Sequence, residues 1–76
     1  MQKIKESLFV HQESLIFEMS LREKGEGEID EAAMNEVLEK HHFGEAERLL
    51  VIGQCCLISP TVDQLHYSQY FAMLSE

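Results

Sequence analysis

Residues 3–24, KIKESLFVHQESLIFEMSLREK, contain no glycine or proline and are the most informative part of the sequence for the fold. At about 100° per residue, its apolar side chains fall on two separate sides of a helix. The broader side consists of Ile4, Leu8, Leu15, Ile16 and Met19, with Phe9 at its edge. The second side is a stripe made by Val10, Phe17 and Leu21. The pattern predicts one long helix with more apolar surface than a single core requires.

The size of this second stripe matters because the chain is small. Burying each large apolar side chain is worth about 1.5–3 kcal/mol, so the stripe represents roughly 5–9 kcal/mol. A domain of 76 residues has a total stability of roughly 4–11 kcal/mol. Two arrangements would cover the stripe: the rest of the chain wraps around it, or a second copy or another protein packs on it.

Turn and capping signals begin a second helix soon after the first one ends. Gly25 and Gly27 break the first helix and open a short acidic loop. Asp30 is placed to cap a helix over residues 31–41, and Phe43-Gly44 forms the next turn. Because that turn is short, we expect the third helix to return antiparallel to the second.

The second half of the chain predicts two more helices. Residues 45–58 become almost wholly apolar and predict a helix buried on most sides, in which Gly53 allows a neighbouring helix to approach closely. Pro60 ends that helix, and Thr61 with Gln64 has capping-box spacing for a fourth. The predicted fold class is therefore all-α: residues 1–76 form one small bundle of about four helices with short loops, and the bundle is dimeric.

The charge of the chain excludes several classes of partner. Six basic residues against 14 acidic ones give a net charge of −8, so neither nucleic acid phosphates nor anionic membranes are expected to bind directly. The acidity is concentrated in a central stretch whose candidate docking residues are Glu23, Glu26, Glu28, Asp30, Glu31, Glu36 and Glu39. This stretch is interpreted either as a solvated face or as a docking patch for a basic partner, including mimicry of nucleic acid.

The residues that could carry chemistry do not form a recognisable site. Cys55 and Cys56 are adjacent, and neighbouring cysteines rarely satisfy disulfide geometry. The histidines show no metal-binding spacing with each other or with the cysteines. An apolar setting also raises the pKa of a thiol and makes it inert. We therefore predict no catalytic residue, no metal and no cofactor; a thiol or metal enzyme that uses Cys55 or Cys56 with histidine is the least favoured alternative.

One segment resembles a known repeat. His42-Phe43-Gly44-Glu45-Ala46, followed by Leu50 and Gly53, is similar to the second helix of a tetratricopeptide repeat. Pro60 stands two positions later than in that repeat, and the preceding helix lacks the expected aromatic and small residues. The resemblance implies a groove that holds a helical or extended peptide, as in small acidic chaperones of bacterial secretion systems.

These observations together favour a protein-interaction module, meaning a regulator, adaptor or chaperone that acts through apolar helix surfaces. The expected partner is another protein, including a second copy of the chain. The candidate contact residues are Val10, Phe17 and Leu21 in the first helix and Tyr67, Tyr70 and Phe71 in the fourth. Of the two candidate faces, the apolar one is assigned to self-association. The cysteine usage and the lack of a signal peptide or membrane span predict a cytoplasmic location.

Overall fold

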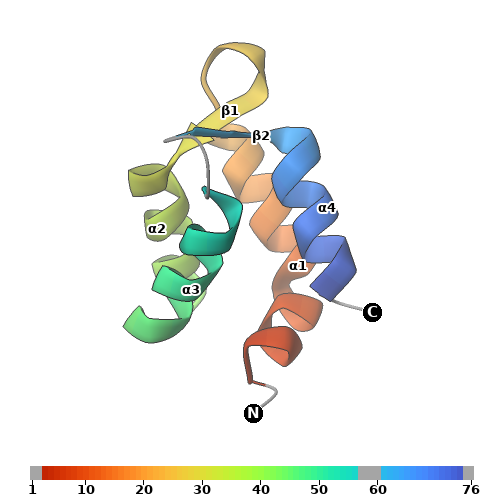
Figure 1. Cartoon of the computed structure of the whole chain (residues 1–76), viewed down its shortest axis with the longest axis vertical. Helices are drawn as coiled ribbons and strands as arrows, with labels where there is room; N and C mark the ends of the chain where they lie inside the picture. The colour runs from red at the N-terminus through yellow and green to blue at the C-terminus, as the bar shows by residue number, and fades with distance from the viewer. Residues whose placement is uncertain (1–2, 57–60, 75–76) are drawn as a thin grey trace.

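The computed structural model describes residues 3–56 and 61–74, with side chains described for residues 10–56 and 61–73. These residues form four α-helices, one 3-10 turn and two short strands (Figure 1). In chain order the elements are α1 (Lys3–Leu21), η1 (Gly25–Gly27), β1 (Glu28–Asp30), α2 (Glu31–Lys40), α3 (Glu45–Cys55), β2 (Thr61–Asp63) and α4 (Gln64–Leu74). The prediction of a small bundle of about four helices is confirmed in part: the described residues are mostly helical, and they add a small two-stranded sheet that the sequence pattern did not predict.

The strands pair antiparallel at one end of the bundle, with Ile29 directly opposite Val62 (Figure 1). Both side chains are buried, and their aliphatic character suits the inner face of a half-buried sheet. Each strand has three residues, which is too short for an alternating pattern to stand out in the sequence. The sheet joins the loop after α1 to the segment before α4.

Each strand ends in an aspartate that caps the next helix. Asp30 Oδ1 accepts a hydrogen bond from the backbone N–H of Ala33 at 2.9 Å, which confirms the predicted cap of α2. Asp63 Oδ1 accepts one from the backbone N–H of His66 at 2.8 Å. The predicted cap at Thr61 is therefore wrong: Thr61 begins β2, and Asp63 caps α4 instead.

The helices pack as two pairs. α1 lies along α4, and α2 lies along α3, as the short turn between α2 and α3 predicts (Figure 1). Side chains from all four helices and both strands fill the core between the pairs. The described core residues are Leu15, Met19, Ile29, Met34, Val37, Leu38, Phe43, Val51, Ile52, Cys55, Val62, Tyr67 and Phe71.

The third helix differs most from its prediction. α3 ends at Cys55, and the rest of the expected helix beyond residue 56, with Pro60, lies outside the described residues. Val51, Ile52 and Cys55 are buried, but Leu49 and Leu50 are 63% and 51% exposed. Gly53 is exposed, and a Cβ atom added there would meet nothing within 4 Å. A helix buried on most sides, with a close neighbour at Gly53, is therefore wrong.

Candidate interaction surfaces

The second apolar stripe of α1 lies in solvent. Val10 is 72% exposed, Phe17 64% and Leu21 70%. Neither α4 nor the short strands cover them, so the described chain does not wrap around this side of α1. Of the two arrangements that the sequence leaves open, the first, in which the rest of the chain covers the stripe, is not found within the described residues. We call these three residues the α1 stripe.

The opposite sides of α1 are fixed by its neighbours. Leu15 and Met19 are fully buried in the core. Toward α2, Glu18 lies 3.2 Å from the Lys40 ammonium, and Arg22 pairs with Glu36. Because these contacts hold the helix on its core side, α1 cannot rotate to bury the stripe without breaking them.

Two histidines, His11 and His41, also contact each other where α1 packs against α2. The rings of His11 and His41 meet edge to face with centroids 5.4 Å apart, and His11 also contacts Phe43. His41 Nε2 lies 3.3 Å from Glu18 Oε2, without hydrogen-bond geometry. Partial burial acts to raise the pKa of Glu18, but Lys40 and His41 outweigh it and lower that pKa.

The aromatic residues of α4 are not a surface cluster. Tyr67 and Phe71 are fully buried, and Tyr70 is half-buried against the core. The Tyr67 hydroxyl donates a hydrogen bond to Glu23, and burial together with this bond raises the tyrosine pKa. The structure therefore uses Tyr67 and Phe71 to dock α4 onto α1 rather than presenting them to a partner.

The acidic stretch is divided between internal contacts and exposed positions. Four of its seven candidate residues have partners within the fold: Glu23 with Tyr67, Glu28 with Thr61, Asp30 with Ala33 and Lys24, and Glu36 with Arg22. The other three, Glu26, Glu31 and Glu39, are exposed. Glu28 and Glu36 are exposed as well, so five of the seven candidate residues lie at the surface, and three of these make no side-chain hydrogen bond or ion pair with another described residue.

The loop between α1 and α2 has the outline of a cation-binding loop. In an EF-hand, a helix–loop–helix loop of 12 residues has glycine at position six and oxygen ligands at positions one, three, five, nine and twelve. Gly27 has φ 72° and suits position six. That register places Arg22 and Lys24 at positions one and three and Ala33 at twelve. Lys24 Nζ instead lies 3.1 Å from Asp30 Oδ2, so an internal ion pair spans the loop and the residues do not fit a calcium ion.

The two cysteines lie at the C-terminal end of α3. Burial raises the pKa of Cys55 to about 12, with Cys56 adding to the effect. Burial also raises the pKa of the half-buried Cys56, and Glu31 and Asp30 add to that shift. Thiols with raised pKa values are poor nucleophiles at neutral pH. Within the described ranges, no three His, Cys, Asp or Glu side chains gather into a metal site.

A second apolar surface, which sequence reasoning missed, lies on α3. Ala46, Leu49, Leu50 and Gly53 are all exposed. Their spacing of i, i+3, i+4 and i+7 places them on one side of the helix, within about 100° of its circumference. The spacing is visible in the sequence, but the surrounding apolar run obscured it. We call these four residues the α3 outer face.

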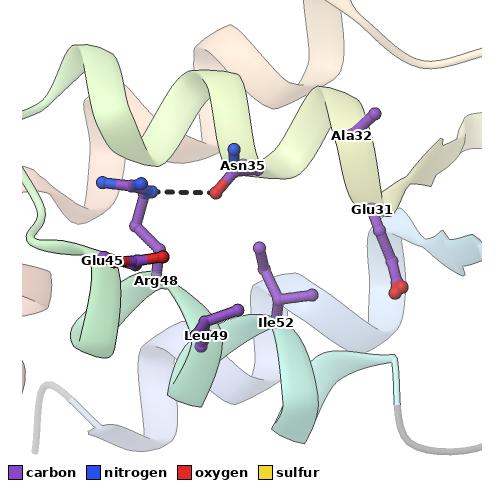
Figure 2. A pocket seen from close by; sticks show the side chains of 7 residues that line it. All are labelled: Glu31, Ala32, Asn35, Glu45, Arg48, Leu49 and Ile52. Carbon is purple, nitrogen blue, oxygen red and sulfur yellow. Dashed lines mark hydrogen bonds between the residues drawn. The ribbon is translucent and has the colours of Figure 1, made fainter.

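A shallow depression runs beside this face, between α2 and α3 (Figure 2). It has a volume of about 370 Å³ and is lined by Glu31, Ala32, Asn35, Glu45, Arg48, Leu49 and Ile52. Arg48 spans it by donating hydrogen bonds of 2.8 Å to Asn35 Oδ1 and to the carbonyl of Phe43. Arg48 is therefore committed to holding α2 against α3.

Comparison with protein-family models, with curated proteins and with solved structures gives no match for this chain. The tetratricopeptide resemblance accordingly rests on the hairpin of α2 and α3 alone. Its two small positions, Ala46 and Gly53, both face solvent. None of the described helices combines the length and the apolar content needed to cross a membrane.

Proposed function

We propose that this protein is a small protein-interaction module, a regulator, adaptor or chaperone, whose partner surface is the α1 stripe. A single observation supports it: three large apolar side chains, each more than three-fifths exposed, lie in line on a helix that its other contacts hold in place. Leaving such side chains in water forgoes the free energy of their burial, which a partner can recover.

The surroundings of the stripe indicate the kind of partner. Between residues 10 and 21, Glu13 is the one exposed charged side chain. Recognition of this surface therefore depends on apolar contact, with Phe17 as the central anchor, since aromatic residues are frequent binding hot spots. The partner is another protein that supplies an apolar helix or extended segment.

The acidic decoy is the second candidate function, and Glu26, Glu31 and Glu39 support it because they project into solvent. It predicts a basic partner whose association weakens steeply as salt is raised. The apolar surface predicts binding that changes little with salt. The secretion-type chaperone and the thiol or metal enzyme are alternatives that no contact in the described residues favours over these two. A cytoplasmic location remains part of the proposal.

Affinity capture from the native host with wild-type protein and with Phe17→Glu tests the α1 stripe. We expect partners that bind wild type to be lost with Phe17→Glu, because the new charge lies in the middle of the apolar contact. Leu65→Glu is the matched control, since Leu65 is 68% exposed on α4 and lies outside the stripe. Equal capture by wild type and Phe17→Glu, with both folded by circular dichroism, would refute the proposal.

Self-association needs a separate measurement, because the sequence assigns it to the same stripe. Sedimentation equilibrium of Phe17→Glu and wild type distinguishes the two occupants. A loss of dimer with Phe17→Glu means that a second copy covers the stripe. If Phe17→Glu dimerises as strongly as wild type, the second copy binds another surface, and the α1 stripe remains available to a different protein.

A further inference from the structure

The depression between α2 and α3 differs in charge from one end to the other (Figure 2). Arg48 crosses it beside Glu45, and its guanidinium is held by Asn35 and by the carbonyl of Phe43. That end therefore combines one positive and one negative side chain. Glu31, at the start of α2, forms the opposite end. Among the described residues, no cationic side chain lines the depression at this end.

The Glu31 end is negative for two reasons. Glu31 is exposed, and its carboxylate makes no ion pair with another described residue. The C-terminal end of α3 lies close by: burial raises the pKa of Cys56, the residue after this helix, and Glu31 and Asp30 raise it further. A helix C-terminus carries partial negative charge, and the last turn of α3 has no basic side chain to offset it. Asp30 is paired with Lys24 and contributes little to this charge.

The middle of the depression is apolar. Leu49 and Ile52 point into it from α3, and Ala32 lines it from α2 (Figure 2). Leu49 is 63% exposed, so it offers contact area, whereas Ile52 is almost fully buried and closes the floor. Ligand pockets enclose most of a small molecule. A depression of about 370 Å³ that is shallow and open instead suits side chains presented by a larger molecule.

We propose that this depression binds an amphipathic helix of a basic partner protein, which places an apolar side chain against Leu49 and Ile52 and a lysine or arginine beside Glu31. A helix carries side chains about 5.4 Å apart from one turn to the next. Ile52 and Cys56 are also one turn apart along α3, so the same spacing leads from the apolar floor to the negative end. The net charge of −8 attracts a basic partner and repels a second copy of this chain. Docking of an apolar helix face into a groove is a common mode of recognition.

This inference does not depend on the α1 stripe, because none of the stripe residues lines the depression. Binding at the depression uses the charge of Glu31 and is expected to weaken as salt is raised, whereas binding at the stripe is expected to change little. The acidic decoy also uses Glu31, but it does not require an apolar contact at Leu49. Substitutions at these two positions therefore distinguish binding at the depression from both other modes.

A fluorescent helical peptide of leucine, lysine and alanine, with its leucines and lysines on one side, is the probe, and anisotropy with the full chain measures its affinity. Leu49→Ser is expected to weaken binding about tenfold, because an apolar contact is lost. Glu31→Gln is expected to weaken it about two- to fivefold, the effect of losing one exposed ion pair. Glu13→Gln on α1 removes the same charge, and Leu65→Ser on α4 removes a similarly exposed leucine. Both controls are expected to bind like wild type, and circular dichroism checks that every variant is folded.

A charge reversal then tests the position of the basic side chain. In a second peptide glutamate replaces each lysine, and wild type is expected to bind it more weakly than the first. Glu31→Lys is expected to reverse this preference, whereas Glu13→Lys is not. The proposal is overturned if wild type binds neither peptide, if it and Leu49→Ser bind the first peptide equally, or if Glu31→Lys keeps the wild-type preference. Loss of the peptide with Phe17→Glu would likewise overturn it, because the peptide would then occupy the α1 stripe.

Discussion

Gly27 and Gly53 differ in whether the fold requires a residue without a side chain. Gly27 has φ 72° in the turn before β1, a conformation that side chains with a Cβ disfavour. Gly53 has ordinary helical surroundings and empty space at its Cβ position. The backbone conformation therefore favours glycine at position 27, whereas the described residues give no reason for glycine at position 53.

Replacing these glycines by alanine should therefore have opposite effects on stability. Gly53→Ala is expected to raise the free energy of unfolding by up to about 1 kcal/mol, because alanine restricts the unfolded chain and meets no neighbour. Gly27→Ala is expected to lower it by about 1–2 kcal/mol through strain at positive φ. Urea unfolding at low protein concentration measures both. A loss of stability with Gly53→Ala would show that the position is constrained within the monomer.

Asp30 should make part of the stability depend on pH. The hydrogen bond from Ala33 and then the contact with Lys24 lower the pKa of its carboxyl below the usual 3.8. A depressed pKa contributes stability that is fully present above about pH 4 and is lost as pH falls through the folded-state value. Asp30→Asn keeps a capping side chain, so we expect it to reduce the acid sensitivity of the melting temperature between pH 5 and 2 more than it changes stability at pH 7. An unchanged acid profile would contradict this role.

At the scale of elements, α4 is held by one side and free on the other. Tyr67 and Phe71 are fully buried, while Leu65 and Met73 are exposed. α1 is divided in the same way between Leu15 with Met19 and the α1 stripe. Both α1 and α4 thus carry apolar residues on two sides. One side of each helix packs into the core, and the other is exposed.

Substitutions of the buried Phe71 and the exposed Met73 measure how much each side of α4 contributes to stability. Phe71→Ala is expected to cost about 3–5 kcal/mol, because it removes a buried ring and leaves a cavity. That is a large part of the roughly 4–11 kcal/mol expected for a domain of this size, so the variant should be partly unfolded at 37 °C. Met73→Ala is expected to change stability by less than about 0.5 kcal/mol. Thermal unfolding followed by circular dichroism compares them, and equal losses would place Met73 in the core.

The whole molecule combines a net charge of −8 with apolar contact faces. Two such molecules repel each other at long range, and salt screens this repulsion. We therefore expect added sodium chloride to strengthen self-association and to leave binding at the α1 stripe nearly unchanged. Sedimentation equilibrium over a salt series measures the first effect. Self-association that weakens as salt rises would indicate that opposite charges hold the dimer together.

The helices, their order and several of their ends follow from local sequence patterns, because helix formation depends on nearby residues. Residues 3–24 lack helix breakers, Asp30 caps the residues that follow it, and the Phe43-Gly44 turn reverses the chain. The exposed line of Val10, Phe17 and Leu21 was also visible as a stripe, although the pattern could not say whether the chain itself would cover it.

Which apolar residues are buried and which lie in solvent depends on contacts between segments that are distant in the sequence. Ile29 and Val62 become a strand pair only because two segments 33 residues apart meet in space, and a three-residue strand has no stability alone. The same spacing relates Asp30 to Asp63 and the buried Met34 to Tyr67, a repeat of structure too sparse to recognise beforehand. Tyr67 and Phe71 are buried in the core, whereas Leu49 and Leu50 are exposed. In a core this small, each helix can bury only one of its sides.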